Sequence, residues 1–166
     1  MVAITIRTAR DGDRRFLRDA VFVLQEHERA LHDSRRPGEA VAEAYRDWML
    51  GEAARRSGAV FIAEADGVPA GFVACWVAEE ESIAETPDSC RFGYVSDICI
   101  LPQFRRLGIA RDLLAAAERH LAAEDVTRLR LNALAGNHSA IATYESSGYA
   151  PYEIRFEKRV AGDFAQ

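Results

Sequence analysis

The stretch Leu101-Pro102-Gln103-Phe104-Arg105-Arg106-Leu107-Gly108-Ile109-Ala110 joins an expected strand to an expected helix. It ends the β-rich run 94–101 and precedes apolar residues at helical spacing over 109–121. The first N–H groups of a helix lack partners within it and lie at the positive end of its dipole, so they favour a bound anion. Gly108 permits close approach of a ligand, and the arginines within 105–111 add positive charge. These features predict a phosphate site.

The same stretch also fits an ordinary helix start with solvated arginines. Its single glycine, Gly108, does not make the Gly-x-Gly-x-x-Gly fingerprint that dinucleotide-binding folds place after a strand. A Rossmann interpretation is therefore excluded. The phosphate site and the plain helix start both stay open until the rest of the chain is considered.

Apolar periodicity around this stretch predicts a mixed sheet with helices. Strands are expected at 4–7, 59–65, 68–77, 94–101, 126–133 and 149–158, and helices at 16–31, 41–53, 109–121 and 137–148. Asp66-Gly67 is a strong hairpin signal between the second and third strands. The apolar stripe Tyr45, Trp48 and Met49 is expected in the core. No repeat or linker divides the chain, so a single α/β or α+β domain over 1–166 is expected.

Composition and charge exclude several classes of protein. The 166 residues are 49% hydrophobic and 28% charged, which is typical of a folded globular chain. A net charge of -5 argues against nucleic-acid binding. Cys75, Cys90 and Cys99 lack C-x-x-C spacing, and His27 and His32 lack the spacing of a helical metal pair, so neither disulfides nor a metal are expected. No run approaches the roughly twenty apolar residues that cross a bilayer, so a cytoplasmic location without membrane association is expected.

Two motifs together resemble a known family. Arg105-x-x-Gly108-x-Ala110, after the strand 96–102 and before a long amphipathic helix, resembles the acyl-CoA signature of the GNAT superfamily of N-acetyltransferases. The segment 137–149 resembles that family's later motif, an asparagine, a tyrosine seven residues on and a closing Gly-aromatic pair. The order of elements also matches from the first strand to the last, so the resemblance covers nearly the whole chain.

The resemblance implies a fold, a co-substrate and a set of site residues. The GNAT fold is a mixed, mostly antiparallel sheet in which two parallel strands, here 94–101 and 126–133, splay apart to hold acetyl-CoA. The implied coenzyme contacts are Ile98, Cys99 and Ile100 for the pantetheine arm, then Arg105, Arg106, Leu107, Gly108, Ile109, Ala110 and Arg111 for the pyrophosphate, and also Asn137 and Tyr144. Tyr144 matches the family's usual proton donor.

The chemistry of acyl transfer supports a role for Tyr144. It lies two helical turns after Asn137, so both side chains can address one ligand. A phenol with a pKa of about 10 protonating a thiolate whose thiol has a pKa of about 8.5 faces a penalty of roughly 2 kcal/mol, small enough for a positioned acid. The alternative is a tyrosine that packs its ring in the core.

A general base is also needed, because a primary amine with a pKa near 10.4 is mostly protonated at neutral pH. Asp97 is the candidate, since it lies on the strand beside the expected thioester. The neighbouring residue is Ser96, where polyamine acetyltransferases of this family often carry a glutamate. The alternative is that Asp97 hydrogen-bonds the backbone near a strand bulge.

An acidic run suggests the charge of the acceptor. Five acids and no base lie within 79–88, namely Glu79, Glu80, Glu81, Glu85 and Asp88, and they equal the net charge of the chain. The run is either a solvated loop or an acidic rim for a cationic acceptor, with Glu26 and Glu28 as companions.

These observations predict an N-acetyltransferase that acts on a small-molecule amine by direct transfer in a ternary complex. A covalent enzyme intermediate is not expected, because Cys99 has no histidine partner by spacing. There are two alternatives: a non-catalytic acyl-CoA-binding sensor or interaction domain, and a protein or peptide N-acetyltransferase. The sequence leaves open whether the chain forms a homodimer.

Overall fold

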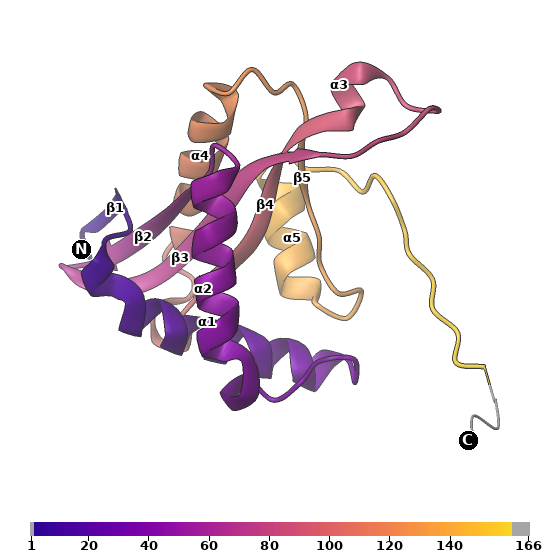
Figure 1. The fold of residues 1–166 in the computed structure, drawn as a ribbon. Helices are drawn as coiled ribbons and strands as arrows, with labels where there is room; N and C mark the ends of the chain where they lie inside the picture. The colour runs from indigo at the N-terminus through magenta and orange to yellow at the C-terminus, as the bar shows by residue number, and fades with distance from the viewer. Residues whose placement is uncertain (1, 161–166) are drawn as a thin grey trace.

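The structure, a computed structural model that describes residues 2–160, is built on a five-stranded sheet of order β1-β2-β3-β4-β5 (Figure 1). Its strands are β1 (Ile4–Thr8), β2 (Ala59–Ala65), β3 (Val68–Glu79), β4 (Arg91–Ile100) and β5 (Leu129–Leu131). The first four pair antiparallel, and β4 and β5 pair parallel. The expected mixed, mostly antiparallel sheet is therefore confirmed.

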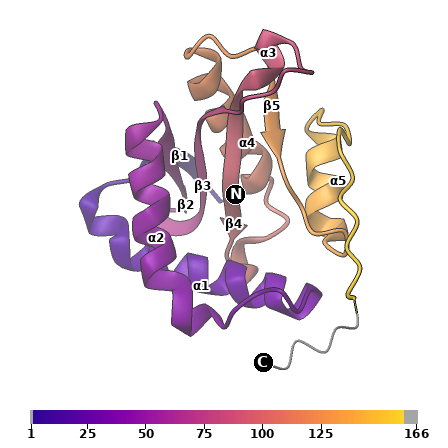
Figure 2. The same ribbon diagram turned by 45° about the vertical axis from the view of Figure 1, so that its right-hand side comes forward.

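Helices cover both faces of the sheet (Figure 2). They are α1 (Arg14–Leu31), α2 (Gly38–Arg55), the short α3 (Pro87–Cys90), α4 (Ile109–Ala122) and α5 (His138–Ser146), with 3₁₀ turns at Asp11–Asp13 and Pro102–Phe104. Because side chains alternate along a strand, Phe72 packs with α1 and α2 while its neighbour Val73 packs with α4. None of the described helices has the length and apolar character that a membrane span requires.

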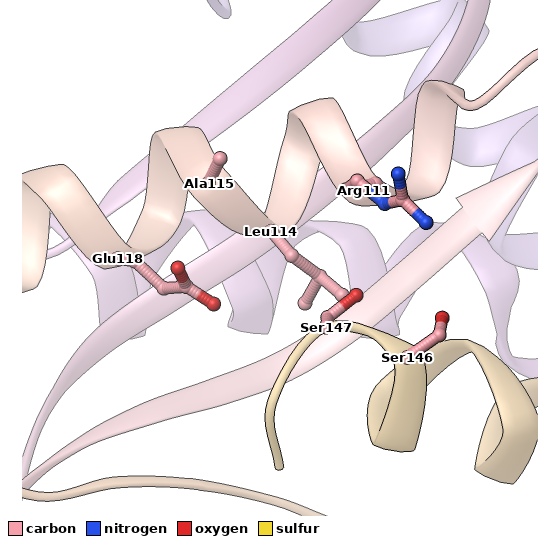
Figure 3. A pocket seen from close by; sticks show the side chains of 6 residues that line it. All are labelled: Arg111, Leu114, Ala115, Glu118, Ser146 and Ser147. Atoms are coloured by element: carbon pink, nitrogen blue, oxygen red, sulfur yellow. The ribbon is translucent and has the colours of Figure 1, made fainter.

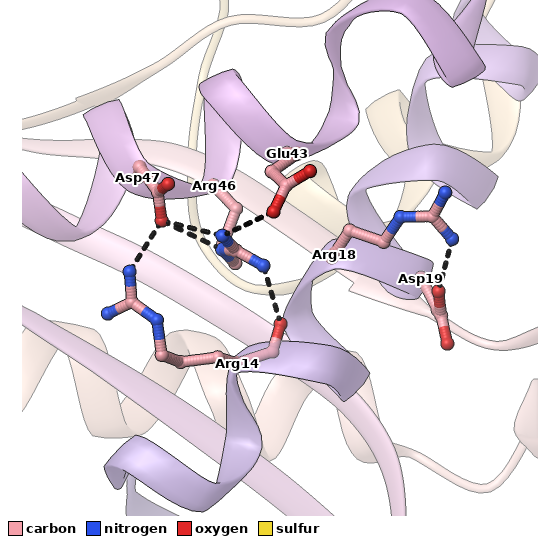
Figure 4. A network of polar contacts seen from close by, with 6 residues as sticks. All are labelled: Arg14, Arg18, Asp19, Glu43, Arg46 and Asp47. Atoms are coloured by element: carbon pink, nitrogen blue, oxygen red, sulfur yellow. Dashed lines mark hydrogen bonds and ion pairs between the residues drawn. The ribbon is translucent and has the colours of Figure 1, made fainter.

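A polar network fixes α2 against α1 (Figure 4). The guanidinium of Arg46 is 2.9 Å from the Asp47 carboxylate and donates to the Arg14 carbonyl at 3.4 Å. The Arg14 guanidinium in turn forms an ion pair with the Asp47 carboxylate at 2.6 Å. A buried arginine is stable only when its donors are paired, so these contacts fix one arrangement of the helices. That arrangement places Tyr45, the residue before Arg46, over the sheet.

A β-bulge in β4 changes which side chains share a face. Ala74 pairs with Asp97 while Cys75 pairs with Val95, so Ser96 is an extra residue in β4. Strict alternation would direct residues three apart to opposite faces of the sheet. With the bulge, Tyr94 packs beside α1 and α2, and Asp97 is bonded by a side chain of α2 on the same face.

The two parallel strands separate soon after they meet. Pairing is confined to residues 93–95 of β4 with 129–131 of β5, and residues 96–100 of β4 have no partner on that side within the described chain. The expected splayed pair is therefore confirmed, although β5 is shorter than the predicted 126–133.

The expected last strand at 149–158 is wrong. Residues 149–160 belong to no helix or strand, and 150–160 are exposed. Alternation of apolar residues shows which side chains share a face, but a strand forms only where a sheet edge accepts its backbone. Among the described residues, no backbone hydrogen bond joins 150–160 to such an edge.

Candidate active site

Free backbone donors converge at the start of α4. Arg106 and Gly108 have φ of 65° and 79°, so the loop turns back on itself before the helix begins. No side chain caps the helix, and no group in residues 2–160 accepts a hydrogen bond from the N–H groups of 106–110. Unpaired N–H groups at the positive end of a helix dipole bind anions. Arg105 joins this loop to the end of β4 by donating to the Ile100 carbonyl at 3.3 Å.

A groove of about 340 Å³ lies between α4 and the end of α5 (Figure 3). It is lined by Arg111, Leu114, Ala115, Glu118, Ser146 and Ser147. The sequence predicted that Arg111 lies near the phosphates, but it did not predict that Ser146 and Ser147 line this groove. The helical spacing of 111, 115 and 118 marks one face of α4, but nothing local in the sequence shows that α5 packs there. The groove adjoins the start of α4, because Arg111 in its first turn is one of the lining residues.

The splay exposes the second edge of β4. Ile98, Cys99 and Ile100 pair with β3 on one side only, so alternate backbone groups of this stretch face the opening between β4 and β5. The Cys99 side chain is buried, and burial raises the pKa of its thiol to about 12. A thiol with that pKa is not a nucleophile at neutral pH, so the contribution of Cys99 is restricted to its backbone.

Tyr144 lies on α5 and contacts the core beneath α4, with its ring centroid 6.4 Å from that of Tyr149. Its hydroxyl has no hydrogen-bond partner among the described residues. Burial, aided by the charges of Glu28 and Asp97, raises its pKa to about 12. The hydroxyl therefore keeps its proton at neutral pH. Protonation of a thiolate by a phenol with this pKa costs about 5 kcal/mol, and a bound cation would lower that cost by offsetting both carboxylates.

Asn137 begins α5 and caps it. Its side-chain oxygen accepts a hydrogen bond from the Ala140 N–H at 3.2 Å. The amide NH₂ group has no described acceptor, so it is available to a ligand while the oxygen stabilises the helix.

Asp97 is buried in a network of neutral donors. Its carboxylate, 8% exposed, accepts hydrogen bonds from the Tyr45 hydroxyl at 2.8 Å and from the Ser96 hydroxyl. Among the described residues no cation pairs with it, and burial raises its pKa. A raised pKa brings a carboxylate nearer to the range in which a general base works at neutral pH. Its bonding partners are side chains, not the backbone groups of the alternative interpretation.

Tyr45 packs against the core as expected, whereas Trp48 does not lie in it. Met49 is fully buried, but Tyr45 reaches Asp97 and Trp48 is 47% exposed. Ring centroids lie 5.1 Å apart for Tyr45 and Trp48, 5.7 Å for Trp48 and Trp76, and 5.9 Å for Trp76 and Tyr94. We call these four side chains the aromatic wall. Apolar helical spacing predicted burial of the whole stripe, whereas α2 directs part of it to this wall beside Asp97.

The candidate acceptor-binding acids have different surroundings. Glu26 accepts a hydrogen bond from the Gly38 N–H at 2.6 Å and so stabilises the start of α2. Glu28 pairs with Arg35 at 2.6 Å, yet its charge contributes to the raised pKa values of Tyr144, Asp97 and Tyr94. Glu28 is therefore an acid of α1 whose charge acts on the candidate catalytic groups.

The acidic run 79–88 is opposed by arginines from other strands. Ion pairs join Glu79 to Arg91, Glu80 and Glu85 to Arg130, and Asp88 to Arg128, at 3.5, 3.9, 3.6 and 2.8 Å. No such partner in the described chain is found for Glu81. Figure 2 places α3 and this connection at the opposite end of the sheet from α1. The run and Glu26 are therefore not brought together, and the negative charge of the run is largely offset.

Asp97 gives a test of burial through the pH dependence of stability. Because its pKa is raised on folding, the folded state gains stability from the protonated form at low pH and loses it as pH rises through the raised pKa. We expect the free energy of unfolding of the wild type to fall relative to Asp97→Asn as pH rises above about 4, by about 1.4 kcal/mol for each unit of the shift. Urea unfolding at a series of pH values measures the difference.

Asp47→Asn is the matched control. The Arg46 side chain donates to the Asp47 carboxylate and lowers its pKa. A lowered pKa stabilises the folded state above the unfolded value, and that stabilisation is lost as pH falls. The wild type should therefore lose stability relative to Asp47→Asn on acidification. The free energy of unfolding of the wild type relative to Asp97→Asn should therefore change with pH in the direction opposite to that measured against Asp47→Asn. A relative stability that does not change with pH, or that changes in the same direction for both variants, would contradict a buried Asp97 without a compensating cation.

Comparisons with known proteins agree with this geometry. Residues 21–149 match the sequence model of the Acetyltransferase (GNAT) family. A search of curated proteins found no match. Among solved structures, the aminoglycoside N-acetyltransferase AAC(6')-Iy in complex with CoA aligns with a TM-score of 0.70 and 20% identity over 96% of each chain.

Two further structures have similar folds. A GCN5-related N-acetyltransferase from Ralstonia eutropha JMP134 aligns with a TM-score of 0.74 and 21% identity, over 96% of this chain and all (100%) of the other. A ribosomal-protein-alanine N-acetyltransferase from Brucella melitensis biovar Abortus 2308 aligns with a TM-score of 0.64 and 23% identity, over 95% and 100%. At such identities the likeness shows the fold, and it does not identify the acceptor.

Proposed function

Because the chain belongs to the GNAT acetyltransferase family, we propose that it transfers an acetyl group from acetyl-CoA to the primary amine of a cationic small molecule, directly and within a ternary complex. The observation that carries this proposal is the partner-free hydroxyl of Tyr144. It lies near enough to Asp97 and Tyr94 of β4 for both to affect its pKa. This supports a role for Tyr144 as the acid at the opening of the splayed strands.

Different residues carry out the separate steps of the transfer. Acetyl-CoA brings the activated acetyl group as a thioester. The free N–H groups of 106–110 bind its pyrophosphate, and the free edge of β4 at 98–100 orients the pantetheine arm and offers N–H donors to the oxyanion. Tyr144 gives its proton to the departing sulfur. Each Asp97 oxygen keeps a second lone pair beside its hydrogen bond, so Asp97 takes a proton from the ammonium group of the acceptor, directly or through water. The neutral amine then attacks the thioester carbonyl, and the C–S bond breaks as the tetrahedral intermediate collapses.

The surroundings of Asp97 favour a cationic acceptor. Glu28 and Asp97 supply negative charge, and the aromatic wall supplies ring faces for a cation. A protonated amine in this site would offset the negative charges of Glu28 and Asp97. The sparse free cysteines fit action in a reducing compartment, so we place the reaction in the cytoplasm.

Release of CoA thiol from acetyl-CoA in the presence of different amines tests the function. Polyamines, aminoglycosides, amino acids and peptides form the panel. We expect release with small cationic amines and a product acetylated at nitrogen. Release with peptides alone would indicate a protein N-acetyltransferase. Acetyl-CoA binding without release for any acceptor would indicate a sensor and would contradict the proposed enzyme.

The contribution of Glu28 can be separated from that of the acidic run. Glu28→Gln should raise the acceptor KM by about tenfold, equivalent to about 1.4 kcal/mol, and leave the acetyl-CoA KM unchanged. Neutralising Glu79, Glu80 and Glu81 together should raise the acceptor KM less and flatten its dependence on salt, since exposed charges act within about 8 Å at 0.15 M salt.

Arg35→Gln is the control for Glu28, because it removes the cation that pairs with this carboxylate. We expect it to lower the acceptor KM. An acceptor KM that is unchanged by Glu28→Gln and Arg35→Gln would show that Glu28 does not meet the acceptor, and a larger effect of the triple variant would assign recognition to the acidic run.

A further inference from the structure

Asp97 differs from the other buried carboxylates of the chain in the groups that bond it. Within residues 2–160 three carboxylates are buried, those of Asp13, Glu52 and Asp97. Arg7 donates to both oxygens of Asp13, at 2.7 and 2.8 Å, and two arginines at the end of α2 pair with Glu52. Asp97 instead accepts hydrogen bonds from two hydroxyls, and no cation of the described chain pairs with it. A neutral donor can orient a carboxylate without the loss of basicity that a neighbouring cation causes.

Equal burial with different partners gives two aspartates opposite properties. Asp13 and Asp97 are each 8% exposed. The Arg7 guanidinium lowers the pKa of Asp13, whereas burial raises the pKa of Asp97, and the hydrogen bonds from Ser96 and Tyr45 offset only part of that rise. Asp13 therefore stays an ion-paired anion. The pKa of Asp97 moves toward the range in which a base works at neutral pH.

The two hydroxyls fix the plane of the Asp97 carboxylate. The terminal torsion of an aspartate side chain has a broad preference, so the orientation of the carboxylate depends on its partners. Tyr45 donates to Oδ1 at 2.8 Å, and Ser96 donates to Oδ2. Ser96 precedes Asp97 in β4, but Tyr45 lies on α2, far away in the sequence. The Tyr45 contact is therefore supplied by the packing of α2 on the sheet.

Tyr45 is itself held in place by its surroundings. Its ring packs against the core between the sheet, α1 and α2, with its centroid 5.1 Å from that of Trp48. The next residue, Arg46, bonds the Asp47 carboxylate and the Arg14 carbonyl, so α2 cannot turn about its axis without breaking that network (Figure 4). The hydroxyl therefore reaches the carboxylate from a rigid support. Partners locked in this way hold a reacting group in a productive geometry.

We propose that Tyr45 is a positioning residue for acetyl transfer: its hydroxyl holds the Asp97 carboxylate in the orientation in which it takes a proton from the acceptor ammonium. This inference rests on the proposed function, in which Asp97 is the base. When the proton moves, an N–H bond of the ammonium breaks and an O–H bond forms on Asp97. Tyr45 keeps its own proton, because burial raises its pKa above that of a free phenol. The role of Tyr45 is orientation and not proton transfer.

Several titratable groups surround Asp97. Besides Tyr45, those whose charges interact with it are Glu28 of α1, Tyr94 and Cys99 of β4, and Tyr144 of α5. Burial raises the pKa values of the two other phenols and of the thiol, so these three groups are neutral at neutral pH. Burial and the charge of Glu28 raise the pKa of Asp97, whereas its two hydrogen bonds lower it. Loss of the Tyr45 hydroxyl should therefore raise the pKa of Asp97 further.

The acid limb of the pH profile of kcat/KM for the acceptor tests the role of Tyr45. Tyr45→Phe keeps the ring and removes one donor to the carboxylate. We expect the limb to move to higher pH by about one unit, equivalent to about 1.4 kcal/mol, and the plateau above it to fall about tenfold. Tyr149→Phe is the matched control, because it also removes a hydrogen bond from a tyrosine to a carboxylate, that of Glu118 at 2.9 Å. It should leave the limb and the plateau unchanged.

Carbon-13 NMR of the Asp97 carboxyl gives a second readout that requires no turnover. Its signal is identified by its absence from the spectrum of Asp97→Asn. The titration midpoint should rise by about one pH unit in Tyr45→Phe and stay unchanged in Tyr149→Phe. An unmoved midpoint in Tyr45→Phe would overturn the contact on which the proposal depends. A raised midpoint without a matching shift of the acid limb would overturn the positioning role.

A double variant shows whether Tyr45 acts through Asp97. If it does, Tyr45→Phe should lower kcat/KM far less in the Asp97→Asn protein than in the wild type, whereas additive losses would overturn the proposal. A wild type that acetylates no amine would reject the proposed function and the positioning role together. An active wild type whose acid limb is not moved by Tyr45→Phe would reject the positioning role alone.

Discussion

Tyr144→Phe is expected to lower kcat by about 10² or more while acetyl-CoA binding stays nearly unchanged. The substitution keeps the ring and its packing beside Tyr149, and it removes a hydroxyl that bonds no described group. The protein therefore loses no hydrogen bond, and its stability should not change. With a pKa raised to about 12, Tyr144 retains its proton throughout the neutral range, so the loss should be similar from pH 6 to 9. Steady-state kinetics and calorimetric titration of the coenzyme measure the two effects.

Tyr149→Phe is the matched control for this loss. Its hydroxyl donates to the Glu118 carboxylate of α4 at 2.9 Å. Removing that hydrogen bond should lower the free energy of unfolding by about 1 kcal/mol and leave kcat unchanged. An undiminished kcat for Tyr144→Phe with chemistry shown to be rate-limiting, or equal losses for the two variants, would exclude Tyr144 as the proton donor.

The anion loop and the β2–β3 hairpin could be predicted because their signals are local. Pro102 ends β4, Gly108 adopts the positive φ that the turn requires, and α4 starts at the next residue. Asp66-Gly67 similarly has positive φ at both residues, as a two-residue hairpin requires. In both places the chemistry of a few adjacent residues determines the backbone, so no knowledge of distant contacts was needed.

The surroundings of Asp97 could not be predicted in the same way. The bulge at Ser96 depends on the register between β3 and β4, and it brings Tyr94 to the face of Asp97. Tyr45 is 52 positions from Asp97 in sequence and lies in a helical stripe whose spacing indicates only an apolar face. Periodicity therefore identified α2 correctly but did not show that one of its residues bonds the candidate base.

Charge counted along the chain was misleading for a related reason. The run 79–88 contains no base, so the sequence left open whether it is a solvated loop or an acidic rim. The sheet brings in arginines that are distant in sequence, as in the pairing of Asp88 with Arg128 across 40 positions. An ion pair on a surface depends on which strands are neighbours, and neighbouring strands are set by tertiary structure.

Replacing Gly108 by valine is expected to weaken acetyl-CoA binding by about 10- to 100-fold, the loss of 1.5 to 3 kcal/mol that charge-assisted hydrogen bonds contribute. Gly108 has φ of 79°, and apart from its neighbours in the chain no described residue comes within 4 Å of the position a Cβ would take. The added side chain would therefore extend into open space at the loop whose free N–H groups we propose bind the phosphates. A β-branched residue also strains this φ, so the loop that aims those N–H groups would shift.

Gly67→Val separates strain from loss of the site. Gly67 also has φ of 79° and open space around its Cβ position, but it lies in the β2–β3 hairpin. Both variants should lose roughly 1–2 kcal/mol of folding stability in urea unfolding, because both force valine into the left-handed region. Calorimetric titration should find weakened acetyl-CoA binding for Gly108→Val alone. Wild-type affinity in folded Gly108→Val would remove the loop from the coenzyme site, and equal weakening in Gly67→Val would show that instability, not a lost phosphate contact, governs binding.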